Sequence, residues 1–267
     1  MLAPTFSYLN DVYLAFGVAA KLPEILERHG IRRPLVVTDA GLVRLGYVDR
    51  LGLKDPAVFD AVQTNPTEAS CRAGLARFRE AGCDGLVALG GGSPIDLAKC
   101  VALGAHHEGP LESFSIGAGG MARITGRVPP LLAIPTTAGS GSEVGRAALL
   151  TLDDGRKLGF ISPHLLPKAA LCDPELTFDL PPLLTAATGM DALSHAVETF
   201  LSPRENPAAD ALALEGLRFG YAHIRHAVGD GRDREARRAM MLCSVLSGLA
   251  FPKSLGAVHS LSHPLGG

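Results

Sequence analysis

The sequence predicts an α/β domain built on an open parallel sheet with helices on both faces, followed by an all-α domain. In the first two thirds of the chain, short apolar runs rich in β-branched residues alternate with amphipathic stretches, which is the rhythm of βαβ units. After Pro181 and Pro182 the stretches have helical periodicity and few β-branched residues. We therefore expect two domains, residues 1–180 and residues 181–267, with the second one helical.

Each predicted element has its own local signal. The run PLVVTD at 34–39 is typical of a parallel strand buried on both faces, and the helix predicted at 66–82 begins on proline and ends on glycine. The stretch 105–129 is rich in glycine, which predicts an irregular surface excursion. The other predicted strands are 11–16, 57–63, 85–90, 129–135, 146–152, 157–162 and 168–174, and the other predicted helices are 17–30, 92–104, 181–203, 207–228 and 233–251.

Composition and charge exclude several classes of protein. The 267 residues are 47% hydrophobic and 19% charged, a balance typical of a globular protein rather than a disordered one. A formal net charge of −2 without a long basic run does not favour nucleic acid or an anionic membrane as a partner. Five cysteines without CxxC spacing argue against a disulfide framework or a zinc ribbon. Because no secretory signal pattern or bilayer-spanning apolar run is present, we expect a soluble, cytoplasmic protein.

The segment LVALGGGSPIDLAK, residues 86–99, joins a strand, a triple-glycine turn and the start of a helix. Glycines let main-chain N–H groups approach a phosphate closely, and the helix N-terminus adds partial positive charge there. Ser93 can cap this helix and donate to a phosphate oxygen. Taken alone, the turn is equally consistent with a tight strand-to-helix corner. It differs from the GxGxxG pattern of the Rossmann fold, because the helix follows a later strand rather than the first.

A second polar loop, AIPTTAGSGSEVG at 133–145, also follows a predicted strand. Its hydroxyl groups, from Thr136, Thr137, Ser140 and Ser142, are interleaved with small residues and could surround a ribose and phosphates. A loop of this composition is more often only a connector. Two such loops in one chain are harder to dismiss, because the carboxyl ends of strands are where open α/β sheets bind ligands.

Asp39 ends the predicted strand 34–39. An acidic residue in this place can accept hydrogen bonds from ribose hydroxyls and repel a 2′-phosphate, which would favour NAD over NADP. The alternative, that Asp39 only caps a short following helix, is at least as common.

Two short segments of the helical region place acidic and histidine side chains one turn apart. In TGMDALSHAVETF, Asp191 and His195 lie at i and i+4 on a helix that is apolar nearly all round, and in GAVHSLSHPLGG, His259 and His263 have the same spacing. Either pair alone could be an ordinary surface feature. A buried carboxylate and imidazole need partners, and one carboxylate oxygen with imidazole nitrogens suits a divalent ion of the iron or zinc type.

Five strings in this order, GGGSPID, IPTTAGSGSEV, DPELT, ATGMDALSHAVE and GAVHSLSHPLGG, resemble the iron-containing (group III) alcohol dehydrogenases. That family shares its fold with glycerol dehydrogenase and dehydroquinate synthase, and the resemblance covers essentially the whole chain. It implies a Rossmann-like dinucleotide-binding domain, a helical metal-binding domain and an active site in the cleft between them. It also implies NAD and a divalent metal, Fe(II) before zinc, as cofactors, with a small alcohol or aldehyde as substrate and a homodimer as the assembly.

The resemblance also implies individual roles. The family's metal ligands match Asp191, His195 and His259, and His263 matches a histidine near the nicotinamide that is commonly assigned to proton relay. The positions that match cofactor-contacting residues are Asp39, Asn65, Gly91, Gly92, Ser93, Thr136, Thr137, Ser140, Lys157 and Leu176.

The chain departs from the family pattern in one respect. The family's fourth metal ligand is a further histidine beyond the PLGG turn, so the resemblance implies a C-terminally truncated chain whose helical domain is incomplete. We expect an NAD- and metal-dependent alcohol dehydrogenase or aldehyde reductase. The alternatives are a hydroxyacid or maleylacetate-type reductase of the same superfamily, and a non-catalytic nucleotide-binding remnant. Since maleylacetate reductases lack the metal, the presence of Asp191, His195 and His259 argues against that branch.

Overall fold

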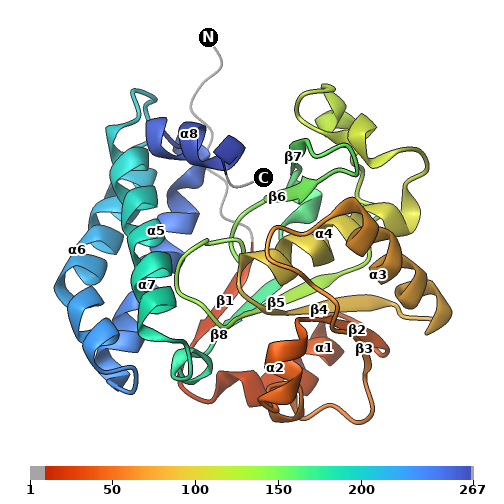
Figure 1. The fold of residues 1–267 in the computed structure, drawn as a ribbon, viewed down its shortest axis with the longest axis horizontal. Coiled ribbons are helices and arrows are strands. Elements are labelled where there is room, and N and C mark those ends of the chain that lie inside the picture. The colour runs from red at the N-terminus through yellow and green to blue at the C-terminus, as the bar shows by residue number, and fades with distance from the viewer. Residues whose placement is uncertain (1–9, 266–267) are drawn as a thin grey trace.

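The computed structural model describes residues 10–265, with side chains as far as residue 262. An α/β part and a helical part lie side by side (Figure 1). The α/β part contains a six-stranded parallel sheet of order β1-β8-β5-β4-β2-β3. Its strands are β1 (Asp11–Leu14), β2 (Pro34–Val37), β3 (Ala57–Phe59), β4 (Gly85–Gly90), β5 (Leu131–Pro135) and β8 (Ala169–Cys172). The parallel sheet expected from the alternating pattern is therefore confirmed.

The four inner strands, β8, β5, β4 and β2, are buried on both faces, which explains why they are apolar without alternation. Along β2, Leu35 and Val37 face one apolar cluster, whereas Val36 between them faces a second cluster on the opposite side. The first cluster is covered by α3 (Glu68–Glu80) and α4 (Gly92–His106), and the second by α1 (Leu22–Arg28) and neighbouring short 3₁₀ segments. The sheet thus has helices on both faces, as predicted.

Several elements are shorter or more broken than the sequence patterns predict. The helix expected at 17–30 is divided into a 3₁₀ turn, Val18–Lys21, and α1, and a short α2 (Ala40–Arg44) follows β2. Beyond the end of α4, the stretch 105–129 contains two 3₁₀ turns, Leu111–Phe114 and Gly120–Arg123, and is otherwise irregular, as predicted. Further 3₁₀ turns lie at Asp49–Leu51, Pro163–Leu165, Pro174–Thr177 and Phe251–Lys253.

Two predicted strands do not join the main sheet. β6 (Ala147–Thr151) and β7 (Lys157–Ile161) pair only with each other, as an antiparallel hairpin. β6 lies against α4, and the N–H of Leu149 donates to the Asp96 carboxylate of that helix at 2.9 Å. The hairpin follows the loop of residues 136–145 after β5, which we call the hydroxyl-rich loop.

The helical part begins with α5 (Pro182–Leu201), followed by α6 (Pro207–Gly229), α7 (Arg234–Ala250) and α8 (Ala257–Leu265). Small residues let the first three approach closely. A Cβ on Gly220 of α6 would lie 2.6 Å from the Cys243 sulfur of α7 and 2.7 Å from a Leu193 methyl of α5. α8 crosses near the end of α5 (Figure 1). Within residues 10–265, no helix has the length and apolar character needed to cross a membrane.

Candidate functional site

Two cavities open near the carboxyl ends of the central strands. The first, of about 720 Å³, is lined by the glycine turn Gly91, Gly92 and Ser93, and we call it the GGGS cavity. The second, of about 460 Å³, is lined by His195 and His259, and we call it the histidine cavity. Open α/β sheets bind ligands at this end of their strands.

The glycine turn is shaped by close contacts that a side chain would disturb. Gly90 has φ +148°, and a Cβ there would lie 2.5 Å from the Pro94 ring. A Cβ on Gly91 would lie 3.2 Å from the Thr137 hydroxyl, and one on Gly92 would lie 3.1 Å from the Ser140 side chain. The turn and the hydroxyl-rich loop therefore form one continuous wall, which the 3.0 Å hydrogen bond from Thr136 N–H to the Gly90 carbonyl also links.

Eight of the ten residues expected to bind the cofactor line the GGGS cavity. They are Asp39, Gly91, Gly92, Ser93, Thr136, Thr137, Ser140 and Leu176. Asn65 and Lys157 are not part of this lining, and the Lys157 ammonium donates to the Asn65 side-chain oxygen at 2.9 Å. The expectation that Ser93 caps α4 was wrong: the helix begins at Gly92, its N-cap is Gly91, and Ser93 lies in its first turn.

Asp39 has both of the features weighed for it. Its side chain caps α2 by accepting from the Leu42 N–H at 3.0 Å, and it also lines the GGGS cavity. Arg44, from the last turn of α2, lines the same cavity. The carboxylate is thus fixed by its capping contact at the wall of a cavity that Arg44 also lines.

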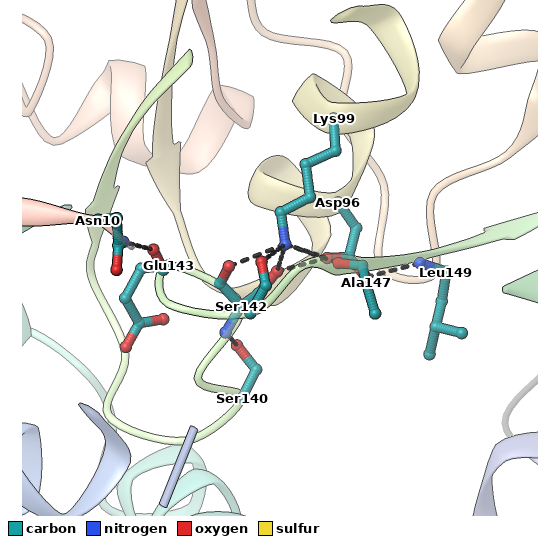
Figure 2. Close-up of polar contacts among 9 residues, drawn as sticks. Asn10, Asp96, Lys99, Ser140, Ser142, Glu143, Ala147 and Leu149 are labelled. Carbon is teal, nitrogen blue, oxygen red and sulfur yellow. Dashed lines mark hydrogen bonds and ion pairs between the residues drawn. The ribbon is translucent and has the colours of Figure 1, made fainter. Parts of the chain in front are cut away.

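A buried lysine holds the hydroxyl-rich loop in place (Figure 2). The Lys99 ammonium of α4 is fully buried and donates to Ser142 Oγ and to the carbonyl oxygens of Ser142, Gly145 and Ala147, at 2.6–2.9 Å. Asp96, one turn earlier, accepts from Ser142 Oγ and lies 4.0 Å from Lys99. Because a buried ammonium must have its N–H groups paired, these contacts bind the segment to α4 at three residues, Ser142, Gly145 and Ala147.

Three potential metal ligands meet between α5 and α8. Asp191 and His195 lie on one face of α5, and His259 comes from α8. The Asp191 Oδ1 lies 3.7 Å from His195 Nε2 and 3.4 Å from His259 Nε2, and one ligand atom from each residue lies within 4.8 Å of the others. The two imidazole rings stack with their centroids 4.3 Å apart.

This donor set fits a divalent transition metal. Oxygen and nitrogen ligands lie about 2.0–2.2 Å from such an ion, which places tetrahedral ligand atoms about 3.4 Å apart, close to the two distances measured from Asp191. Burial lowers the pKa of His195 to about 4, so its ring is neutral at physiological pH, and neutral imidazole is the form that binds a metal. The three residues therefore have the spacing of a metal site, and His195 has the neutral form that such a site requires.

Glu198 is a further site residue that the sequence reasoning did not identify. It lies on the same face of α5 as Asp191 and His195, and its carboxylate contacts His259 Nδ1 and accepts from the Val258 N–H. Burial alone would raise the pKa of Glu198, but these hydrogen bonds outweigh it and hold the pKa below its usual value. The spacing 191, 195, 198 in DALSHAVE was the signal that could have revealed it.

The interaction with Glu198 also orients the His259 ring. With Nδ1 bound to Glu198, Nε2 points to Asp191. A hydrogen bond with Asp191 raises the pKa of His259, burial opposes this effect, and Glu198 adds to it. Such carboxylate–histidine pairs fix the tautomer and orientation of metal-binding imidazoles. The side chain of His263, expected to relay a proton, lies outside the described residues.

The two cavities meet at Asp191, His195 and His259, which we call the triad. Ser140 and Asp191 line both of them, whereas His195 and His259 line only the histidine cavity. A ligand that fills the GGGS cavity as far as Ser140 would therefore end beside Asp191. The geometry suits a reaction between two ligands, with an extended nucleotide in the GGGS cavity and a small substrate in the histidine cavity.

Comparisons with known proteins agree with this arrangement. The family model "Iron-containing alcohol dehydrogenase" matches residues 10–174, and the model of that family's C-terminal region matches residues 185–267. The 4-hydroxybutyrate dehydrogenase of Cupriavidus necator is 58% identical over 97% of this chain and 69% of its own length.

Solved structures of an oxidoreductase and of a reductase have the same fold as this chain. A 1,3-propanediol oxidoreductase superimposes with a TM-score of 0.92 at 38% identity, over 97% of this chain and 70% of that one. Sulfoacetaldehyde reductase from Bifidobacterium kashiwanohense, solved in complex with NAD+, superimposes with a TM-score of 0.93 at 32% identity, over 99% and 71%. With both family models matched in order and 58% identity to one relative over the aligned residues, the chain belongs to the iron-containing alcohol dehydrogenase family.

Proposed function

We propose that NAD binds along the GGGS cavity and that Asp191, His195 and His259 hold a divalent metal, Fe(II) before zinc, beside its nicotinamide end. As a family member the chain is an oxidoreductase of the iron-containing alcohol dehydrogenase type. The observation that carries the residue assignment is the sharing of Ser140 and Asp191 between the two cavities. Because of this sharing, a cofactor bound along the GGGS cavity would end beside the proposed metal ligands.

The reaction is the reversible transfer of a hydride between the alcohol carbon and the nicotinamide. In reduction, the aldehyde carbon takes the hydride from NADH and its oxygen takes a proton, which gives the alcohol and NAD+. When bound, the metal would act as a Lewis acid on the substrate oxygen, and the nicotinamide would carry the hydride.

The chain's own residues bind and orient the reactants. The main-chain N–H groups at the start of α4 and the hydroxyls of Thr136, Thr137 and Ser140 suit the pyrophosphate and ribose of the cofactor. Glu198 keeps the His259 ring in place, and the Phe251 ring packs edge-on against His195, with ring centroids 4.7 Å apart. The histidine cavity then holds the substrate against the triad.

Turnover with and without metal tests the proposal. Purified protein would be treated with a chelator, reloaded with Fe(II) or Zn²⁺, and assayed for NADH oxidation with a series of small aldehydes. We expect activity only after reloading, and we expect Asp191→Asn to abolish it and to reduce bound metal measured by elemental analysis. NADH oxidation that persists without metal would contradict the assignment. The homodimer and the cytoplasmic location stay predictions, tested by light scattering and by cell fractionation.

A further inference from the structure

We propose that Arg146 and Arg204 bind a carboxylate at the far end of the substrate, so that the preferred substrates are ω-hydroxy acids and the corresponding aldehyde acids. Both arginines line the histidine cavity together with His195 and His259, and neither lines the GGGS cavity. This inference rests on the proposed function, because it assigns the substrate of the same site.

The two guanidinium groups belong to exposed side chains on the wall of the histidine cavity. Arginines elsewhere on the surface, such as Arg72, Arg156 and Arg218, form ion pairs with nearby carboxylates. Among the residues whose side chains are described, Arg146 and Arg204 form none, and both are exposed. Two cations on the wall of one cavity without acidic partners are available to an anionic ligand. A guanidinium presents its N–H groups in a planar fork that matches a carboxylate.

The main chain around Arg146 is fixed by buried hydrogen bonds. The carbonyl oxygens of Gly145 and Ala147, on either side of it, accept from the Lys99 ammonium at 2.9 and 2.6 Å (Figure 2). The carbonyl of Arg146 itself accepts from the Ser162 N–H at 3.2 Å. Lys99 is thus a positioning residue that holds Arg146 at the cavity wall. Such preorganisation reduces the entropy lost when a ligand binds.

The acidic groups of the cavity are compensated, so they do not cancel the arginines. Asp96 accepts from the Ser142 hydroxyl and the Leu149 N–H, and it lies 4.0 Å from the Lys99 ammonium. Asp191 belongs to the triad proposed to bind the metal. The guanidinium groups of Arg146 and Arg204 therefore remain for the substrate. The similarity to a 4-hydroxybutyrate dehydrogenase, at 58% identity, agrees with a carboxylated substrate.

Paired substrates that differ only in the terminal group test this inference. The Fe(II)-loaded protein would be assayed with NADH and either 4-oxobutanoate or butanal, which replaces the carboxylate by a methyl group. We expect a higher kcat/KM for 4-oxobutanoate, and we expect Arg146→Gln and Arg204→Gln each to reduce the ratio of the two kcat/KM values about tenfold, because each removes a charge-assisted hydrogen bond. Arg146→Lys should retain part of the preference, since it keeps the charge but loses the fork.

A control variant and a direct binding measurement complete the test. Arg127→Gln, an exposed arginine outside the histidine cavity, is the matched control and should leave the ratio unchanged. Without NAD, no turnover occurs, so calorimetry can measure 4-hydroxybutyrate binding directly, and the two arginine variants should weaken it by a similar factor.

The possible outcomes separate this inference from the proposed function. If the arginine variants lower kcat/KM for 4-oxobutanoate and for butanal by the same factor, the arginines have a structural role and the inference is overturned. Equal kcat/KM values for 4-oxobutanoate and butanal in the unaltered protein would also overturn it while leaving the proposed function intact. A higher kcat/KM for sulfoacetaldehyde than for 4-oxobutanoate would exclude the carboxylate in favour of a sulfonate. If no aldehyde is reduced by the metal-loaded protein, the proposed function itself fails, and the calorimetric binding of 4-hydroxybutyrate then decides the inference.

Discussion

The Glu198 carboxylate on α5 contacts the His259 ring and the Val258 main chain on α8, and thereby joins the two helices that carry the proposed metal ligands. One oxygen accepts from the Val258 N–H and the other contacts His259 Nδ1. The same residue thus places α8 against α5 and selects the nitrogen that faces Asp191. Glu198 therefore contributes both to the orientation of the site and to the docking of α8.

Glu198→Gln should therefore weaken metal binding by about 10- to 100-fold, which is typical for loss of a carboxylate that orients a metal-bound histidine. Competition with a chromogenic chelator measures this affinity in the unaltered protein and the variant. Glu205→Gln, an exposed glutamate in the loop before α6, is the control. Equal affinity in all three proteins would mean that His259 needs no support from Glu198.

Gly92→Val should abolish NADH binding while the protein stays folded. A Cβ at this position would lie 3.1 Å from the Ser140 side chain, so branched methyl groups would fill the space between the glycine turn and the hydroxyl-rich loop. Fluorescence titration with NADH and circular dichroism measure binding and folding. Gly117→Val, where a Cβ would meet no atom within 4 Å, should leave both unchanged. NADH affinity that survives in Gly92→Val would reduce the turn to a structural corner.

Asp39→Asn should narrow the preference for NADH over NADPH by about tenfold. Asparagine can still cap α2 as Asp39 does, so the change removes the negative charge and keeps the hydrogen bond with Leu42. Arg44, in the same cavity, then remains to attract the 2′-phosphate. Titration with both cofactors measures the two affinities. An unchanged ratio would place the ribose away from Asp39.

Glu143→Gln should stabilise the protein above pH 7 and have little effect below pH 4.5. Burial raises the pKa of Glu143 from 4.5 to about 7, so the folded protein holds this proton more tightly than the unfolded chain. The stabilising effect of the bound proton is complete below pH 4.5 and is lost as the pH rises to about 7. The pKa difference corresponds to about 3 kcal/mol at most.

Urea unfolding of the unaltered protein and of Glu143→Gln, at pH 5 and pH 8, measures this effect. The difference between the two proteins removes the titration of all other groups. Because Glu143 Oε1 has no hydrogen-bond partner among the described residues, glutamine should not lose a contact there. A difference in unfolding free energy that is the same at both pH values would show that Glu143 does not titrate in this range.

Local sequence patterns were sufficient for the main outlines of the fold. Continuous apolar runs predicted the strands buried on both faces, and helical periodicity after Pro181 predicted α5, α6 and α7. The i, i+4 spacing placed Asp191 and His195 on one helix face without any tertiary information. These features depend on backbone geometry that repeats over a few residues, so the sequence carries them directly.

Other features were decided by contacts between residues far apart in the chain. The sequence analysis did not assign the strands 146–152 and 157–162 to a separate hairpin. Whether such strands join the sheet depends on which other elements pack against them, and here β6 is bound to Asp96 of α4. Lys99 could not be identified as the residue that holds the Arg146 loop, since its acceptors lie 43–48 positions later.

The sequence by itself determined that α/β elements are followed by helices, that two polar loops follow strands, and that Asp191 and His195 share a helix face. Only the tertiary structure decided that Glu198 orients His259, that Ser140 and Asp191 connect two cavities, and that Arg146 and Arg204 line the same one. The physical reason is the range of the interactions: hydrogen bonding and periodicity within an element follow from neighbouring residues, whereas a site depends on which elements pack together and at what distance.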